Sequence, residues 1–314
     1  MNFDLYRPAL MNVKPQQNQP LDSVRALLTG AIDYAGLFPP SQLTMADAVV
    51  NFAKYRASEH SWMLGRFVVP VARLDELRET ASQFAEREGS PWPVSALAAE
   101  DIYDTLKRLS LFNSQNTGGF AVDSLEVKAN SVSKIENTID ALPDGITTFF
   151  EVGLGSNFAE LIATLAIDHQ HAKIRTGGVT PEEFPRSRDI IRFVRTCLAG
   201  NVPFKGTAGL HHPIRCYRPL TYAENGPSGT MHGFLNLFLM TGFARESYKP
   251  DVLEELMEEE FGEVFQFTDA GLTWRGENFL SNWQIERLRR LGVQSFGSCS
   301  FEEPVEDLKA LGLL

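Results

Sequence analysis

Eight short apolar runs alternate with amphipathic stretches along the chain, and this alternation constrains the fold more than any other feature of the sequence. It is typical of parallel α/β folds, because each parallel strand needs a crossover connection, usually a helix, before the next strand can pair with it. The pattern predicts strands at residues 31–37, 66–71, 92–98, 122–129, 146–153, 171–176, 202–208 and 293–298.

The intervening stretches have helical spacing and predict helices at residues 45–57, 75–87, 100–111, 133–141, 158–167, 181–199 and 305–311. The helix at 181–199 has the clearest start, with Thr180 as N-cap and Pro181 in the first position. Eight strand–helix units favour a (β/α)8 TIM barrel. A doubly wound open sheet is the alternative, but it usually has fewer strands and a glycine-rich first turn, and neither dinucleotide nor P-loop motifs occur.

The chain is expected to form one domain, residues 21–314, preceded by an N-terminal arm at residues 1–20 that contains three prolines. An insertion at about 213–280 separates the seventh and eighth strands. Its sequence predicts helices at 231–244 and 250–261 and a hairpin at 265–274, and we expect it to cap the barrel mouth.

Acidic residues outnumber basic ones by 40 to 29, which gives a net charge of -11. A surface of this sign repels phosphate backbones and anionic membranes, so neither nucleic acid nor a membrane is an expected partner. No apolar stretch approaches the roughly 20 residues of a membrane helix. The N-terminus has no apolar secretory core. The three cysteines form no C-x-x-C pair, which indicates a reducing compartment, so we expect a cytoplasmic protein.

The apolar segment 35–40 suits either the barrel floor or an interface between copies of the chain, which leaves a homo-oligomer open. A small anionic molecule is the partner that the sequence favours, and no cofactor is implied.

Side chains of a barrel strand alternate between the lumen and the helix layer, and the helix-facing set must be apolar. In the fourth to seventh strands, residues such as Leu125, Phe150, Ile174 and Phe204 therefore face outward. The same alternation directs six charged side chains toward one hollow: Glu126, Lys128, Glu151, Lys173, Arg175 and Lys205. Asp33 of the first strand is a further candidate for this pocket.

Six converging charges are a poor way to build a core, because burying an isolated charge costs several kcal/mol or more. They lie near the carboxyl ends of the strands, where barrel active sites are found. We therefore predict a catalytic set of Lys173, Lys205, Glu151, Glu126 and Lys128. The alternative is a layer of salt bridges that plugs the barrel and has no chemistry.

The strand exits are rich in glycine and hydroxyl residues. Backbone N–H groups exposed by glycine, beside serine and threonine hydroxyls, suit an anion or phosphate. The predicted substrate- or anion-binding set is Arg175, Thr176, Gly177, Thr207, Gly209, His211, His212, Gly297, Ser298, Ser300 and Asp33.

The C-terminal half of the chain resembles deoxyribose-phosphate aldolase and related class I aldolases. Residues 173–177 (KIRTG) resemble that family's K-T-S-T-G strand, and residues 204–209 (FKGTAG) its V-K-A-S-G-G strand. Residues 296–300 (FGSCS) resemble its phosphate-binding F-G-A-S-S turn, and residues 149–151 its I-I-E strand. The motifs occur in the family's order. The combination of segments 30–40, 173–178 and 209–213 also resembles a bacterial family, which implies no activity.

The aldolase resemblance implies a class I (Schiff-base) lyase that acts on a small phosphorylated or carboxylated carbonyl compound. Lys173 would form the imine, Lys205 would lower the pKa of Lys173, and Glu151 or Glu126 would move protons. The chain departs from the family pattern at Arg175, which replaces a small residue. His211, His212 and the insertion have no counterpart in that pattern.

Two other functions remain open. His211 and His212 with Glu151 could hold a divalent metal in a metal-assisted hydrolase or isomerase, although adjacent histidines on an extended segment point opposite ways. The second is a non-catalytic binder of a sugar phosphate. Cys299 has no histidine placed beside it by the sequence, so we expect it to be a small buried residue.

Overall fold

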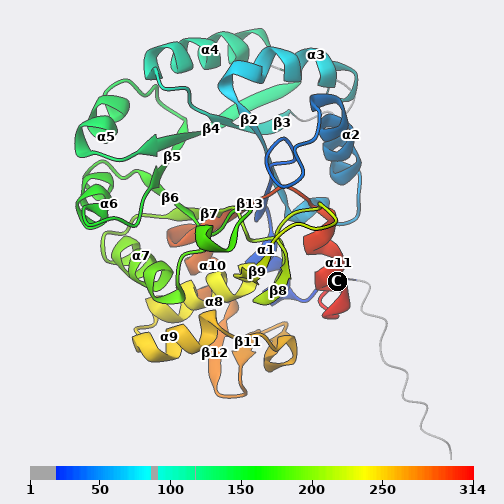
Figure 1. Ribbon diagram of the computed structural model, residues 1–314, viewed down its shortest axis with the longest axis vertical. Coiled ribbons are helices and arrows are strands. Elements are labelled where there is room, and N and C mark those ends of the chain that lie inside the picture. Colours follow the sequence, from blue (N-terminus) through cyan, green and yellow to red (C-terminus); the bar gives the residue numbers. More distant parts are fainter. Residues whose placement is uncertain (1–18, 86–90, 117) are drawn as a thin grey trace, which may run out of the picture.

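The computed structural model describes residues 19–85, 91–116 and 118–314, so most of the arm expected at residues 1–20 lies outside the described residues. Eight parallel strands close into a barrel with helices around it, which confirms the predicted barrel architecture (Figure 1). In the order in which they pair around the barrel, the strands are β1 (Ile32–Tyr34), β13 (Val293–Ser298), β7 (Phe204–Thr207), β6 (His171–Arg175), β5 (Thr147–Val152), β4 (Phe120–Ala129), β3 (Trp92–Leu97) and β2 (Leu64–Pro70).

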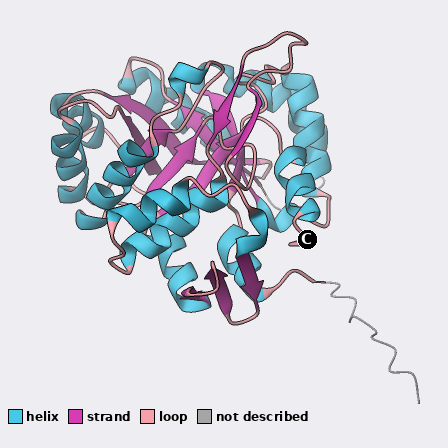
Figure 2. Cartoon of the chain, turned by 60° about the horizontal axis from the view of Figure 1, so that its bottom comes forward, coloured by secondary structure: helices cyan, strands magenta, loops and turns pink. Residues whose placement is uncertain are grey.

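Helices follow the barrel strands and cover their outer faces, as Figure 2 shows. They are α2 (Met45–Arg56), α3 (Leu74–Ala85), α4 (Ile102–Gln115), α5 (Val132–Ile139), α6 (Phe158–Ile167), α7 (Ser187–Ala199), α8 (Phe234–Arg245) and α11 (Glu302–Ala310). A short helix, α1 (Asp22–Leu28), precedes β1. The side chains of Thr44, Asp101 and Ser131 cap the starts of α2, α4 and α5 by accepting hydrogen bonds from exposed backbone N–H groups.

The helix predicted at 181–199 is wrong in its first turns. Thr180 does lead into a helical turn, but this is a short 3-10 segment, η3 (Pro181–Glu183), and α7 begins only at Ser187. Pro185 explains the break, because the residue before a proline is driven out of the helical region. Phe184 accordingly has extended backbone angles. The break lets the Phe184 ring pack at the exits of β6 and β7, where it lies close to Gly177 and Gly209.

The residues between β7 and β13 contain more structure than the predicted two helices and hairpin. They form a two-stranded ribbon of β8 (Cys216–Pro219) and β9 (Ser228–Met231), then α8, α9 (Pro250–Met257) and α10 (Asn282–Leu291). The predicted hairpin is part of a three-stranded sheet: β10 (Phe265–Thr268), β11 (Gly271–Trp274) and β12 (Asn278–Ser281). This sheet contacts α1, which leads into the amino end of β1, so it does not cover the carboxyl ends of the strands.

Residues 35–40 lie at the carboxyl end of β1, not on the barrel floor. The Ala35 amide donates a hydrogen bond to the carbonyl of Ser298 at the end of β13, and Pro40 lines a small cavity beside His211. Over the described residues, no helix is both long and apolar enough to cross a lipid bilayer.

Candidate active site

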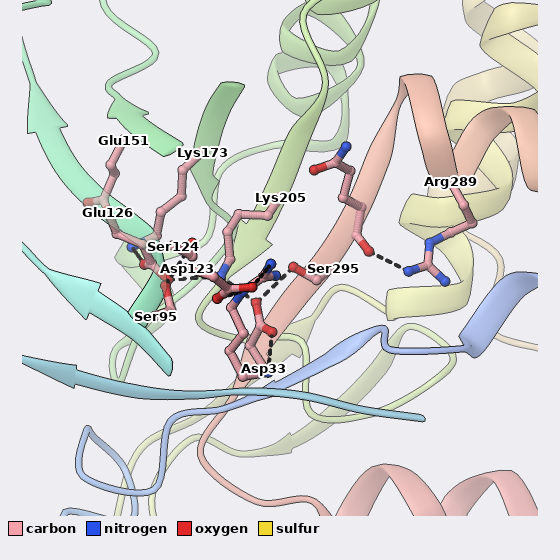
Figure 3. Close-up of polar contacts among 12 residues, drawn as sticks. Asp33, Ser95, Asp123, Ser124, Glu126, Glu151, Lys173, Lys205, Arg289 and Ser295 are labelled. Carbon is pink, nitrogen blue, oxygen red and sulfur yellow. Dashed lines mark hydrogen bonds and ion pairs between the residues drawn. The ribbon is translucent and has the colours of Figure 1, made fainter. Parts of the chain in front are cut away.

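Five charged side chains fill the middle of the barrel and contact one another in sequence (Figure 3). We call this set the ion-pair chain: Asp33, Lys205, Glu126, Lys173 and Glu151. At its closed end, the Lys205 ammonium on β7 lies 2.5 Å from Asp33 Oδ2 on β1 and 2.8 Å from Glu126 Oε1 on β4. The three side chains are at most 4% exposed. Lys205 also lies over the Phe149 ring, 5.2 Å from its centroid.

Glu126 joins the two lysines. Its second oxygen, Oε2, lies 2.6 Å from the Lys173 ammonium on β6. Lys173 in turn lies 2.8 Å from Glu151 Oε2 on β5, the member of the chain nearest the open end. Strand register places Glu151 beside Lys173 and Lys173 beside Lys205. The prediction that Glu126, Glu151, Lys173 and Lys205 converge is therefore confirmed.

Neutral groups complete the coordination of the buried carboxylates. The Ser95 hydroxyl donates to Glu126 Oε1 at 2.9 Å, and the Ser295 hydroxyl donates to Asp33 Oδ2 at 2.8 Å. The backbone N–H of Arg66 donates to Asp33 Oδ1 at 2.9 Å. These partners matter because a buried carboxylate with unfilled lone pairs is costly. Neither serine was predicted. Ser95 lies between the apolar Val94 and Ala96 and could have been assigned to the lumen, whereas Ser295 follows the polar Gln294 and gave a weaker signal.

The charges stabilise one another. Burial alone would raise the pKa of Glu126, but the ammonium groups of Lys173 and Lys205 outweigh it and hold that pKa well below its usual range. Burial alone would lower the pKa of Lys205, but Asp33 and Glu126 raise it above its ordinary value. Two ammonium groups thus face three carboxylates, and Lys205 presents no uncompensated positive charge to Lys173.

A cavity of about 380 Å³ opens where β2 to β6 end, and Lys173, Glu126 and Glu151 line it. Two further lysines, Lys128 and Lys134, lie on its wall. The cavity is large enough for a small organic molecule. Asp33 and Lys205 are not among its lining residues, so Lys173 is the lysine of the ion-pair chain that a ligand would meet.

Lys128 and Arg175 are not part of the buried cluster, contrary to the register prediction. Both are exposed. Each lies at or next to the last residue of its strand, where the side chain extends past the barrel into solvent. Their positive charges nevertheless act on Glu151. Burial raises the pKa of Glu151, Lys173 lowers that pKa most, and Arg175 and Lys128 lower it further.

Most of the predicted anion-binding groups serve the fold instead, and none of that set lines the cavity that contains Lys173. The Thr176 hydroxyl donates to the carbonyls of Thr207 and Ala208. Gly177 and Gly209 allow the exits of β6 and β7 to pack closely: a Cβ on Gly209 would lie 2.9 Å from the Gly177 Cα.

The turn after β13 is similarly self-contained. Ser298 accepts a hydrogen bond from the Ser300 amide, and Ser300 accepts one from the Glu303 amide at the start of α11. Gly297 packs against Thr207, whose hydroxyl oxygen would lie 3.2 Å from a Cβ at that position. These contacts close the turn and give no support for a phosphate cradle there.

His211 and His212 do not join Glu151 in a metal-ligand set. His212 Nδ1 lies 2.6 Å from Asp307 Oδ2, and His211 Nδ1 lies 3.4 Å from Glu303 Oε2. Both acceptors are on α11, one helical turn apart. Within the described ranges, no group of three histidine, cysteine or acidic side chains is arranged to hold a metal ion.

The expectation for Cys299 was wrong in one respect. Cys299 is buried as predicted, but a histidine does lie beside it: His211 Nδ1 is 3.7 Å from its sulfur. The two residues are 88 positions apart, so no local motif could have shown the contact.

No protein-family model matches this chain, and comparison with curated proteins and with solved structures found no match.

Proposed function

We propose that the protein is a class I aldolase-like lyase in which Lys173 forms a Schiff base with a small anionic carbonyl compound. One observation carries this proposal: Lys173 lines the mouth cavity and lies between two carboxylates, Glu126 and Glu151. The resemblance of residues 173–177 and 204–209 to the lysine-bearing strands of deoxyribose-phosphate aldolase supports the same assignment.

Lys173 must lose a proton before it can attack a carbonyl carbon. Glu151 is the better acceptor, because it lines the cavity and its side chain is 18% exposed, whereas Glu126 stays ionised against Lys205. Once Lys173 is neutral, Glu151 loses its main cationic partner and burial raises its pKa. Glu151 then holds the proton until the substrate oxygen needs it.

The neutral amine adds to the carbonyl carbon to form a carbinolamine. Glu151 returns its proton to the carbinolamine hydroxyl, which leaves as water and gives the imine. Glu151, ionised again, takes the proton of a hydroxyl group on the β-carbon of the imine, and the bond between the α- and β-carbons breaks. The β-carbon leaves as a carbonyl product, and the electron pair stays on Lys173 as an enamine, which is protonated and hydrolysed to release the second product. Lys205 takes no part in these bonds: it keeps Glu126 ionised, and Glu126 fixes the position of Lys173.

Lys128 and Lys134 are the groups best placed to hold the anionic end of the substrate. Both line the cavity. Lys134 donates to the Glu100 carbonyl at 2.9 Å, and Lys128 has no ion-pair partner in the described part of the chain. A phosphate or carboxylate would attract both ammonium groups.

The test is reductive trapping. The full chain is treated with borohydride in the presence of a panel of small phosphorylated and carboxylated aldehydes and ketones, and peptides are analysed by mass spectrometry. We expect a reduced adduct on Lys173. Lys173→Met should abolish it, whereas the matched variant Lys134→Met should retain it and need a higher substrate concentration.

A panel that gives no adduct on Lys173, or an adduct only on Lys128 or Lys134, would count against the proposal. The second candidate is a non-catalytic binder of a sugar phosphate, which is favoured by the complete pairing of both buried lysines with carboxylates. Calorimetric binding of a sugar phosphate without any trapped adduct would support that candidate instead.

A further inference from the structure

A second cluster of reactive side chains surrounds Cys299, just after β13. Its sulfur lies 3.7 Å from His211 Nδ1 and 3.7 Å from the Tyr222 hydroxyl oxygen. The three residues come from three separate segments: the turn after β13, the loop after β7 and the turn after β8. Cys299 is 4% exposed and His211 is 7% exposed.

Glu303, in the first turn of α11, holds both partners of the thiol. Its Oε2 lies 3.4 Å from His211 Nδ1, and its Oε1 accepts a hydrogen bond of 2.8 Å from the Tyr222 hydroxyl. Burial and the neighbouring thiol and carboxylate raise the pKa of Tyr222, so it stays protonated and donates. The cluster is therefore a connected set of four side chains and not an isolated cysteine.

The cluster favours a thiolate beside an imidazolium. Burial alone would lower the pKa of His211, but Cys299 and Glu303 raise it to about 10. Burial alone would raise the pKa of Cys299, yet the hydrogen bond from His211 brings it below the ordinary value. The other two cysteines differ, because burial raises the pKa of both Cys197 and Cys216.

The space beside this cluster decides what can react there. His211, Tyr222 and Glu303 line a cavity of about 30 Å³. A cavity of ~10–15 Å³ holds one water molecule, whereas organic ligands occupy pockets of about 300 Å³ or more. Cys299 is not among the residues that line this cavity, so a reagent reaches its sulfur only past His211 and Tyr222. The space therefore favours an oxidant only slightly larger than water.

We propose that Cys299, His211 and Glu303 form a peroxide-reactive thiol site, separate from the lysine chain. The thiolate sulfur attacks one oxygen of hydrogen peroxide and the O–O bond breaks. The sulfur is oxidised to a sulfenic acid, S–OH, and the peroxide is reduced. The departing hydroxide takes a proton from the His211 imidazolium and leaves as water.

The experiment treats the full chain with hydrogen peroxide and stops the reaction by unfolding it with a thiol-alkylating reagent. Peptide mass spectrometry then follows each of the three cysteines. We expect Cys299 to lose its thiol about ten-fold faster than Cys216, and His211→Gln to remove that advantage. His232→Gln is the matched control, since His232 is also buried but contacts the Pro185 carbonyl and should leave the rate unchanged.

Two further measurements keep the outcome decisive. In a pH titration followed by ultraviolet thiolate absorbance, the lowest cysteine transition should disappear in Cys299→Ser and move to higher pH in His211→Gln. Cys197 is 0% exposed, so its failure to react with peroxide shows that each variant is folded. If His211→Gln does not fold, Glu303→Gln should slow the oxidation of Cys299 in its place. Oxidation of Cys299 no faster than that of Cys216, or at a rate that neither variant changes, would overturn the proposal.

Discussion

Glu126 links two lysines through its two oxygens, so the charges of Asp33, Lys205, Glu126, Lys173 and Glu151 stabilise one another as a unit. This ion-pair chain is stable only while every one of its side chains is present. Removing one partner of a buried pair leaves the other charged and desolvated, which costs more than the pair itself contributes.

Lys205→Met should therefore destabilise the protein by about 3–5 kcal/mol. The variant leaves Asp33 and one oxygen of Glu126 buried without their cation. Urea unfolding followed by circular dichroism measures the change. Lys128→Met is the matched control, because its exposed side chain should alter the free energy of unfolding by no more than about 0.5 kcal/mol. Equal effects of the two variants would contradict the conclusion that Lys205 is a buried member of the ion-pair chain.

Acid should weaken the fold through Glu126. The folded pKa of Glu126 lies well below the ordinary value of 4.5, so the unfolded chain binds more protons as the pH falls below that value. The stability contributed by Glu126 is fully present above pH ~4.5 and is lost as the pH falls toward the folded pKa.

The unfolding free energy of Glu126→Gln should accordingly fall less steeply below pH ~4.5 than that of the wild type. Urea titrations at several pH values measure the slope. Glu79→Gln, on the exposed surface of α3, should keep the wild-type slope. A Glu126→Gln slope that matches the wild type would show that Glu126 is not held ionised by its lysines.

The alternation of single residues predicted the buried cluster well, because Leu125, Phe150, Ile174 and Phe204 fix which neighbours face inward. It could not show where a strand ends, so Lys128 and Arg175 were placed in the lumen although their side chains reach solvent. The pairing of Cys299 with His211 depends on two loops that meet only in the closed barrel, and no periodicity reports such a meeting.

The exits of β6 and β7 form one packed element with the Phe184 ring. Gly209 has a φ of +72°, and a Cβ there would lie 2.6 Å from that ring and 2.9 Å from the Gly177 Cα. Gly276 has nearly the same φ, +73°, but a Cβ there would meet nothing within 4 Å. Substitutions at the two glycines can therefore distinguish the cost of backbone strain from the cost of close packing.

Gly276→Ala should cost about 1 kcal/mol, which is the price of a left-handed alanine. Gly209→Ala should cost a further ~1–3 kcal/mol because the added methyl group overpacks the two exits. Thermal unfolding of both variants measures the difference. Equal losses would mean that the strand exits move apart without cost.

Elements with strong periodicity were predictable, and elements decided by one residue or by tertiary contacts were not. All eight barrel strands were expected within a few residues of their observed positions. The break before α7 follows from Pro185, which the clear helix start at Thr180 obscured. The ribbon of β8 and β9 consists of four-residue strands rich in polar residues, so it carried no apolar signal.

The whole molecule carries a net charge of -11, and its like charges repel one another across the surface. Raising the sodium chloride concentration to about 0.5 M should screen this repulsion and raise the midpoint of thermal unfolding. The destabilisation caused by Lys205→Met should stay the same in salt, because ions do not reach a side chain that is 1% exposed. A salt-dependent effect of that variant would place Lys205 in contact with solvent.

At the scale of the molecule, the count of strand–helix units predicted the closed barrel, since eight units are what closure requires. The position of the segment between β7 and β13 was not predictable. Its three-stranded sheet packs on α1, a contact between segments more than 200 residues apart that local patterns do not encode.

Because one glutamate serves two lysines, the barrel interior constrains how this protein can evolve. A lineage that lost Asp33 would leave Lys205 without one of its two carboxylate partners. Replacing Lys205 would in turn leave one oxygen of Glu126 without its cation and disturb Lys173. The five positions would therefore be inherited together or exchanged together, and a well-packed apolar set is the replacement that leaves no charge buried without a partner.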